Sequence, residues 1–141
     1  MGMNGNETKK MKVYLGGWTG ETEYRSDVVK IYSEEFRIVN PMVETPHDLG
    51  SNLIVEVDKQ LINACNIMVV YITRYTAGSM MEILYAWERG IPVYAITTEI
   101  NFTNDIWLSY HVTKFFKYVV DCFDDIRTIS KDCNCGGDCG I

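Results

Sequence analysis

The side chain that first suggests chemistry is Glu82, the only polar residue between Met80 and Trp87. It stands near the start of an expected helix, just after a polar turn that contains Gly78 and Ser79. One interpretation is a capping box, in which the Ser79 side chain caps the helix and the Glu82 carboxylate accepts a hydrogen bond from the backbone amide of Ser79. The other is an anion site, because free amides at a helix N-terminus attract negative groups. In that interpretation Glu82 stands one helical turn from the anion.

Two further side chains are expected to lie close to Glu82, in a crevice at the end of the predicted sheet. Asp58 is an acid on a helix face with apolar neighbours, and Tyr14 lies in the middle of a strand that ends in a glycine turn. Taken singly, Asp58 is typical of a solvated helix residue and Tyr14 of a core residue. Their expected position with Glu82, at the mouth of one crevice, favours a functional site instead.

Alternating strand and helix patterns would position these three residues. Apolar runs rich in β-branched and aromatic residues predict strands over 12–17, 37–40, 67–72, 91–97 and 114–120. Helical spacing of apolar residues predicts helices over 21–36, 51–66, 79–90, 105–112 and 122–133. Pro41 is expected to stop the second strand, residues 42–50 to form a loop, and Ser51 to cap the next helix. This order predicts a single α/β domain with a doubly wound, mainly parallel, five-stranded sheet and helices on both faces.

Ligands of such sheets bind beyond the carboxyl ends of the strands, near the switch in strand order. Two loops of this sequence have that position. The first is GGWTGE, residues 16–21, after the first strand, and the second is RYTAGS, residues 74–79, after the third strand. The continuously apolar strand 67–72 is typical of a parallel sheet that is covered on both faces.

The composition is that of an ordinary globular domain, with 141 residues, 47% hydrophobic residues and a net charge of −6. Because no cluster of Lys and Arg stands out, we expect no binding to polymeric nucleic acid. No apolar run approaches the ~20 residues of a membrane helix, and the N-terminus has no signal-peptide core, so we expect a cytoplasmic protein. The expected organisation is a disordered leader over 1–10, one domain over 11–130 and a flexible Cys/Gly-rich tail over 131–141.

The five cysteines fall into two groups. Cys65 and Cys122 lie among apolar residues, where cysteine behaves as a small core side chain. Cys133, Cys135 and Cys139 lie in the glycine-rich tail without a nearby histidine. A zinc or iron–sulfur site is one interpretation of this cluster and a frayed tail is the other, which we favour. We therefore expect neither a metal nor another cofactor.

Four motifs taken together resemble the nucleoside 2-deoxyribosyltransferase family, including its branch of nucleoside 5′-monophosphate N-glycosidases. They are KVYLGGWTGE, NPM, EVDKQLINACNIMVVYI and AGSMMEILYAWERGIPVYAI, and they fall between Lys12 and Ile96. Each motif alone is loose, whereas their order and spacing are specific. The resemblance implies a flavodoxin-like sheet, and a homodimer or higher homo-oligomer in which a neighbouring subunit helps to complete the site.

The resemblance also implies roles for the three residues described above. Glu82 matches the family's catalytic nucleophile, Asp58 the acid on the preceding helix, and Tyr14 the tyrosine that hydrogen-bonds the glutamate. The implied activity is cleavage or transfer at the N-glycosidic bond of a 2′-deoxynucleoside or its 5′-monophosphate, through a covalent sugar–enzyme intermediate. Such a bond breaks through an oxocarbenium-like transition state, which a carboxylate beneath C1′ stabilises.

The substrate-binding residues implied by the resemblance lie in the two loops: Gly16, Gly17 and Trp18 in the first, and Thr76, Gly78 and Ser79 in the second. The transferases carry an acid six residues before the catalytic glutamate, where this sequence has Thr76. A hydroxyl there resembles the monophosphate hydrolases, whereas Trp18 resembles the transferases. Asn104 lies near, but not aligned with, the asparagine that a neighbouring subunit donates in the family. Water and a second base both stay open as acceptors, and hydrolysis of a monophosphate is slightly favoured.

Two other classes of function fit the same fold. A catalytically silent nucleotide-binding or sensor domain has no need of a buried nucleophile, so the presence of Tyr14, Asp58 and Glu82 argues against it. A flavodoxin-like FMN protein needs a hydroxyl-rich phosphate turn after the first strand, and GGWTGE does not supply one. We therefore favour an enzyme that acts on a small nucleoside or nucleotide.

Overall fold

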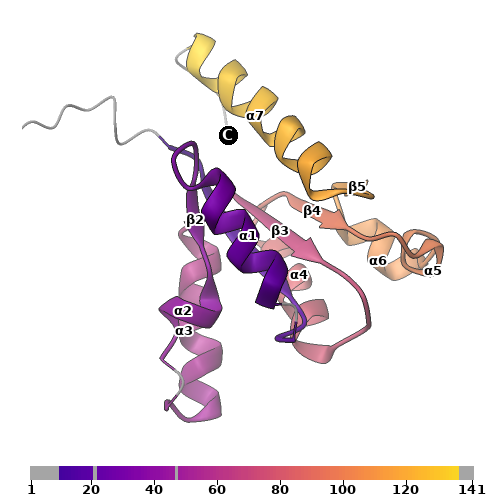
Figure 1. Ribbon diagram of the computed structural model, residues 1–141. Helices are drawn as coiled ribbons and strands as arrows, with labels where there is room; N and C mark the ends of the chain where they lie inside the picture. The colour runs from indigo at the N-terminus through magenta and orange to yellow at the C-terminus, as the bar shows by residue number, and fades with distance from the viewer. Residues whose placement is uncertain (1–9, 21, 47, 137–141) are drawn as a thin grey trace, which may run out of the picture.

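The structure is a computed structural model that describes residues 10–20, 22–46 and 48–136 (Figure 1). Its elements follow in the order β1 (Lys12–Gly17), α1 (Thr22–Tyr32), β2 (Arg37–Val39), α2 (Pro41–Glu44), α3 (Ser51–Asn63), β3 (Ile67–Tyr71), α4 (Ala77–Glu88), β4 (Val93–Ile96), α5 (Ile100–Thr103), α6 (Ile106–His111), β5 (Lys114–Phe116) and α7 (Val119–Gly136). The predicted leader lies outside the described residues except for Lys10, and so does the predicted tail beyond residue 136.

The five-stranded sheet is parallel throughout, with the strand order β2-β1-β3-β4-β5. The chain runs outward from β1 to β2, returns past β1 to β3, and then continues in the opposite direction to β4 and β5. The switch in strand order therefore falls between β1 and β3, whose ends meet where Gly17 pairs with Tyr71. This is the flavodoxin-like order, and it confirms the predicted fold class.

Helices cover both faces of the sheet, and each face has its own apolar core (Figure 1). Because successive side chains of a strand point to opposite faces, neighbours in β1 belong to different cores. Val13 and Leu15 pack in the core formed with α1 and α7, whereas Tyr14 packs in the core formed with α3, α4 and α6. Tyr14 therefore faces the two helices that carry Asp58 and Glu82.

The segment after β2 differs from the prediction of a loop behind a strand-ending proline. Pro41 instead begins the short helix α2. Asn40 caps this helix, because its side-chain oxygen accepts a hydrogen bond of 3.0 Å from the Met42 amide. Proline suits the first helical position, where its fixed φ is helical and its missing N–H would have had no intrahelical acceptor. The turn of α2 places the residues that follow it against the candidate site.

Other element ends also differ from the prediction. Gly50, rather than Ser51, is the N-cap of α3, and no side chain bonds to the start of that helix. β5 is shorter than the predicted strand, and α7 begins at Val119 inside it. α7 also continues to Gly136, past residue 131 where the flexible tail was expected to begin.

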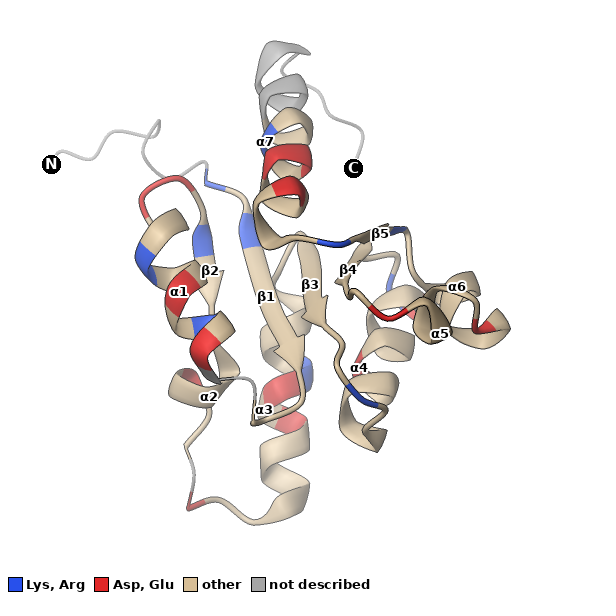
Figure 2. Cartoon of the chain, turned by 45° about the vertical axis from the view of Figure 1, so that its right-hand side comes forward, with Lys and Arg blue, Asp and Glu red and all other residues tan. Residues whose placement is uncertain are grey.

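Charged residues lie on helices, in turns and at the first residues of strands, rather than in the middle of the sheet. β3 and β4 contain no charged residue, and the coloured segments in Figure 2 fall outside them. Within the three described stretches of the chain, no helix is both long and apolar enough to cross a membrane.

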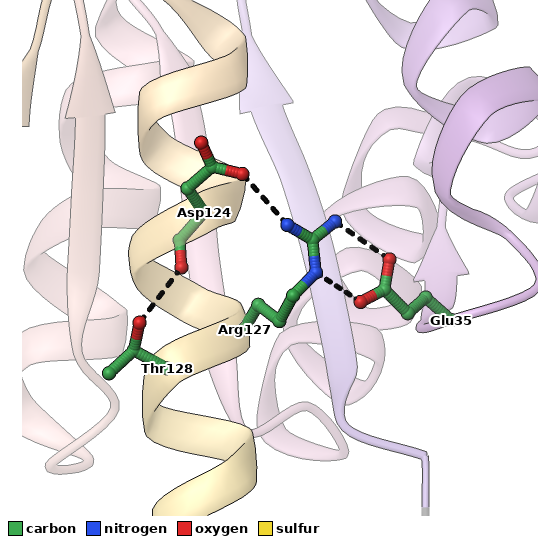
Figure 3. A network of polar contacts seen from close by, with 4 residues as sticks. All are labelled: Glu35, Asp124, Arg127 and Thr128. Atoms are coloured by element: carbon green, nitrogen blue, oxygen red, sulfur yellow. Dashed lines mark hydrogen bonds and ion pairs between the residues drawn. The ribbon is translucent and has the colours of Figure 1, made fainter.

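A polar network joins α7 to the turn between α1 and β2 (Figure 3). Arg127 donates from Nη2 to Glu35 Oε1 at 2.8 Å, and its Nε donates to the other oxygen of the same carboxylate. A third hydrogen bond of 2.8 Å joins Arg127 Nη1 to Asp124 Oδ1. These side chains are partly exposed to water, so the network links α7 to this turn but contributes little to stability.

Candidate active site

A cavity of about 220 Å³ lies at the carboxyl end of β1. Its lining comes from the β1–α1 loop, α1, α2, α3 and α4, and consists of Gly17, Thr19, Arg25, Pro41, Met42, Thr45, Pro46, Ile54, Asp58 and Glu82. The cavity adjoins the switch in strand order, where proteins with this sheet bind their ligands. Asp58 and Glu82 were predicted as catalytic residues from different parts of the sequence, and they share this one cavity.

Tyr14 and Glu82 form the polar pair at the base of the site. The Tyr14 hydroxyl donates a hydrogen bond of 2.9 Å to Glu82 Oε2, although the two residues are 68 positions apart in the chain. Tyr14 is fully buried in β1, so its phenol has no freedom to turn away. The strand therefore fixes Oε2 of the carboxylate, while Oε1 lies beside Gly16.

The capping-box interpretation of Glu82 is wrong. Thr76 is the N-cap of α4, and its side chain accepts a hydrogen bond from the Ser79 amide. Ser79 is therefore the third residue of the helix rather than its cap, and Glu82 lies in the second turn, beyond the reach of the cap. The hydrogen bond from Tyr14 is the polar contact that holds Glu82 instead.

The surroundings of Glu82 raise the pKa of its carboxyl group toward neutral pH. Burial raises the pKa of Glu82 to about 7, and the negative charge of Asp58 acts in the same direction. The hydrogen bond from Tyr14 and the positive charge of Arg25 oppose this rise. Burial, together with the negative charges of Glu82 and Asp58, raises the pKa of Tyr14 far above its ordinary value. The phenol therefore stays protonated and donates its hydrogen bond to Glu82. Glu82 therefore titrates at a higher pH than an exposed glutamate.

Asp58 is held by a threonine from the segment after α2. The Thr45 hydroxyl donates a hydrogen bond of 2.6 Å to Asp58 Oδ1. Burial raises the pKa of Asp58, while the bond from Thr45 and the charge of Arg25 lower it. A half-buried carboxyl with a raised pKa is suited to carrying a proton to or from a ligand.

Most of the lining residues were not predicted as site residues, and two of these, Arg25 and Thr45, form hydrogen bonds at the site. Arg25 is 2% exposed and comes from α1, where it has helical spacing to the buried residues Val28 and Tyr32. A cation at helical spacing to core residues is the sequence signal that could have identified it. Thr45 lies in the segment predicted as a loop, and no sequence signal distinguishes it.

Two glycines of the first loop, Gly16 and Gly17, lie at the end of β1. A Cβ atom on Gly16 would stand 3.6 Å from Glu82 Oε1, so this residue borders the carboxylate directly. Gly17 has φ +133°, and a Cβ atom there would lie 2.7 Å from the Tyr71 carbonyl oxygen. Only glycine fits that position. Trp18 lies outside the cavity lining, with the Arg74 guanidinium 3.6 Å from the centre of its ring.

The second loop also lies outside the cavity lining. Thr76 donates a hydrogen bond of 2.9 Å to the Ser79 hydroxyl, and Ser79 is buried. Gly78 is exposed at the start of α4, and a Cβ atom there would meet no atom within 4 Å. The structure thus places these three residues together at the N-terminus of α4, and brings only Glu82 of the same helix into the cavity.

Within residues 10–20, 22–46 and 48–136, no three His, Cys, Asp or Glu side chains are grouped to hold a metal ion. Cys65 and Cys122 are buried and unpaired. Cys133 and Cys135 lie along α7, and Cys139 lies outside the described residues.

Comparison with known proteins assigns this α/β protein to a family. The family model described as nucleoside 2-deoxyribosyltransferase like matches residues 10–100, a range that includes Tyr14, Asp58 and Glu82. The chain belongs to this family, which confirms the resemblance inferred from its motifs. No curated protein sequence matches significantly.

Solved structures agree in fold. A conserved protein from Enterococcus faecalis V583 aligns with a TM-score of 0.70 and 17% identity, over 84% of this chain and 98% of that one. A 2-deoxyribosyltransferase from Bacillus psychrosaccharolyticus aligns with a TM-score of 0.66 and 16% identity, over 78% and 88% of the two chains. A 2-deoxyribosyltransferase from Leishmania mexicana gives a TM-score of 0.64 and 14% identity, over 81% and 95%.

Proposed function

We propose that the protein is an enzyme that breaks the N-glycosidic bond of a 2′-deoxynucleoside or its 5′-monophosphate, with Glu82 as the nucleophile. The observation that carries this proposal is the Glu82 carboxylate, held by Tyr14 in the same cavity as Asp58. Burying a carboxylate raises the free energy of its ionised form, so a protein that only binds a nucleotide gains nothing from it. Membership of the family supports the same reaction class.

The first step transfers the sugar to the enzyme. The free oxygen of Glu82 attacks C1′ while the bond from C1′ to the base nitrogen breaks, and the bonding electrons leave with the base. Asp58, the second carboxyl group of the cavity, delivers a proton to the departing base. Tyr14 fixes the other oxygen of Glu82 and so directs the attacking one. The product is a deoxyribosyl ester of Glu82 and a neutral free base.

The second step releases the sugar. Water or a second base attacks C1′ on the side that the first base left, and the C1′–oxygen bond to Glu82 breaks to restore the carboxylate. Asp58, now ionised, accepts the proton of the attacking molecule. Attack by water makes the enzyme a hydrolase, and attack by a base makes it a transferase. Two displacements at C1′ retain the configuration of the sugar.

Product analysis with a panel of substrates tests the proposal. The protein is incubated with deoxynucleosides and their 5′-monophosphates, each with and without a second free base, and the products are separated by chromatography. Free base together with free sugar or sugar phosphate identifies a hydrolase, whereas a new nucleoside identifies a transferase. Binding without any product across the whole panel would contradict the proposal and identify a silent nucleotide-binding domain.

We expect the N-terminus of α4 to decide between phosphorylated and free substrates. The first amides of this helix have no intrahelical acceptor, and Thr76 and Ser79 add hydroxyls next to them. Thr76→Asp should preserve the helix, because aspartate is also a good cap, and should add a charge that repels phosphate. A charge-assisted hydrogen bond contributes about 1.5–3 kcal/mol, so kcat/KM for a monophosphate should fall about ten- to a hundredfold relative to the free nucleoside.

Two further variants control this phosphate test. Thr76→Asn keeps a neutral cap and should change the ratio of the two substrates far less than Thr76→Asp does. Ser79→Ala should raise KM for the monophosphate more than KM for the nucleoside. If the wild type prefers free nucleosides and no variant alters the ratio, α4 binds no phosphate and the protein is a nucleoside enzyme.

We also propose that the protein is a homodimer or a higher homo-oligomer, which forms through α4 and α6. These helices expose large apolar side chains: Met81, Leu84, Trp87, Ile106, Trp107 and Tyr110. An exposed apolar surface of this kind is typical of a protein–protein interface. Because α4 also carries Glu82, a partner bound there lies close to the site.

Sedimentation equilibrium tests the oligomer. Wild type should sediment as a dimer or larger species, and Trp107→Glu should shift it toward monomer because it places a charge at the centre of the apolar surface. Ile31→Glu is the control, since Ile31 is also apolar and exposed but lies on α1. A wild-type protein that stays monomeric at micromolar concentration would refute this interface.

A further inference from the structure

Arg25 reaches the candidate site from the opposite side of the sheet. Its helix, α1, packs against the face of β1 that carries Val13 and Leu15, whereas Asp58 and Glu82 come from helices on the other face. Arg25 nevertheless lines the same cavity as the two carboxyl groups. Its side chain therefore passes the carboxyl end of β1, where the sheet ends and the two faces meet.

The guanidinium group of Arg25 binds backbone carbonyls at the end of β1 and in the turn that follows. Nη2 donates to the Gly17 carbonyl oxygen at 2.8 Å, and Nη1 donates to that of Trp18 at 3.2 Å. Nε donates to the Leu15 carbonyl oxygen at 3.4 Å. A planar fork with donors on three nitrogens fixes a turn in a way that a single ammonium group does not.

The same guanidinium is a buried positive charge beside two acids. Arg25 is 2% exposed, so water screens its charge weakly. The charged or titratable groups that face Glu82 are Tyr14 from β1, Asp58 from α3 and Arg25 from α1. Of these, Arg25 alone carries a positive charge, and it lowers the pKa of both Glu82 and Asp58.

We propose that Arg25 is a positioning residue of the site, which fixes the glycine turn with its fork and places a positive charge beside the two carboxyl groups of the cavity. The catalytic consequence rests on the proposed function of Glu82 as a nucleophile, whereas the electrostatic consequence holds for any role of that carboxylate. The effect of the charge can be separated from that of the fork, because both glutamine and lysine lack the two Nη donors and only lysine keeps the charge.

Arg25→Gln should move the ionisation midpoint of Glu82 upward. Loss of a nearby opposite charge shifts a carboxyl group by about one pH unit, so kcat/KM below the midpoint should fall about tenfold and recover at alkaline pH. Arg25→Lys should keep the midpoint close to that of the wild type and raise KM at every pH, because the turn is held less firmly. Arg127→Gln removes an arginine charge far from the cavity, on the surface of α7, and should change neither property.

NMR titration of glutamate side-chain carboxyl carbons tests the proposal without relying on activity. The Glu82 signal is assigned as the one that Glu82→Gln removes. It should titrate near pH 7 in the wild type and about one unit higher in Arg25→Gln. An unchanged midpoint in folded Arg25→Gln would overturn the proposal even if the enzyme is active. A shifted midpoint in a protein without glycosidase activity would support it and refute the proposed function instead.

A second measurement on the wild type covers the case in which Arg25→Gln does not fold. The Nε–H resonance of Arg25 should change with the same midpoint as Glu82, because the guanidinium senses the charge of the carboxylate in the shared cavity. An Arg25 resonance that stays constant while Glu82 titrates would overturn the proposal.

Discussion

Glu82→Gln should reduce turnover by about 10³-fold or more while the protein stays folded. The amide has the size of the carboxylate and can still accept the hydrogen bond from Tyr14. It carries no negative charge to stabilise an oxocarbenium-like transition state, and it cannot form a sugar ester by direct displacement. Steady-state kinetics with the best substrate of the panel provides the measurement, and retained activity would exclude Glu82 as the nucleophile.

The same variant should be more stable than the wild type at alkaline pH. Folding raises the pKa of Glu82 from 4.5 to about 7, so the folded state binds more protons between these values. The contribution of Glu82 to stability is therefore most favourable below the unfolded value, falls as the pH rises through this window, and stays unfavourable above it. Because Glu82 is only partly exposed, replacing it with glutamine should add about 1–3 kcal/mol to the free energy of unfolding at alkaline pH.

Denaturant unfolding at acidic and alkaline pH measures this effect. The gain from Glu82→Gln should disappear at acidic pH, where the wild-type carboxyl is protonated in both states. Glu88→Gln on the exposed side of the same helix is the control and should show no comparable gain. A Glu82→Gln protein that is less stable than the wild type at every pH would mean that the carboxylate is there for the fold.

Asp58→Asn should lower kcat by about 10²- to 10⁴-fold, the range typical of losing a general acid and base. Asparagine keeps an oxygen for the Thr45 hydroxyl, so the local structure should survive. It has no proton to give to the departing base. Nucleosides whose base leaves easily without protonation should therefore lose much less activity than nucleosides whose base leaves poorly.

Rates with two leaving groups separate this role from binding. Kinetics are measured for wild type and Asp58→Asn with a good and a poor leaving base on the same sugar. An equal loss with both bases would show that Asp58 binds the substrate and transfers no proton. Thr45→Val is the matched control, because it removes the hydrogen bond to Asp58 but leaves the acid in place.

The sequence predicted the sheet well because strands carry a strong local pattern. The run KVYLGG predicts the bounds of β1, and the continuous apolar run at Ile67 predicts a central strand covered on both faces, as β3 is. The region around α2 was predicted less well. A proline such as Pro41 can either end a strand or begin a helix, and the sequence does not say which. In the structure, the hydrogen bond from the Met42 amide to the Asn40 side chain shows that Pro41 begins a helix.

The site was harder to predict than the fold, since its contacts join distant segments. No local pattern states that Tyr14 donates to Glu82, and the resemblance to the family suggested that pair. The capping-box interpretation failed because Thr76 and Ser79 are both good caps, and the chain uses the earlier one. Arg25 escaped notice because a charged residue in an amphipathic helix is ordinarily solvated.

A covalent bond between the sugar and Glu82 is the central feature of the proposed mechanism. A 2-fluoro-substituted nucleoside destabilises the oxocarbenium-like transition states and slows both steps, so the ester should accumulate during turnover. Intact-mass measurement should then find one added fluorodeoxyribosyl group, and peptide mapping should place it on Glu82 in the wild type and find none in Glu82→Gln. Continued slow release of the base with no added mass on the protein, or with the added mass on another residue, would contradict the account.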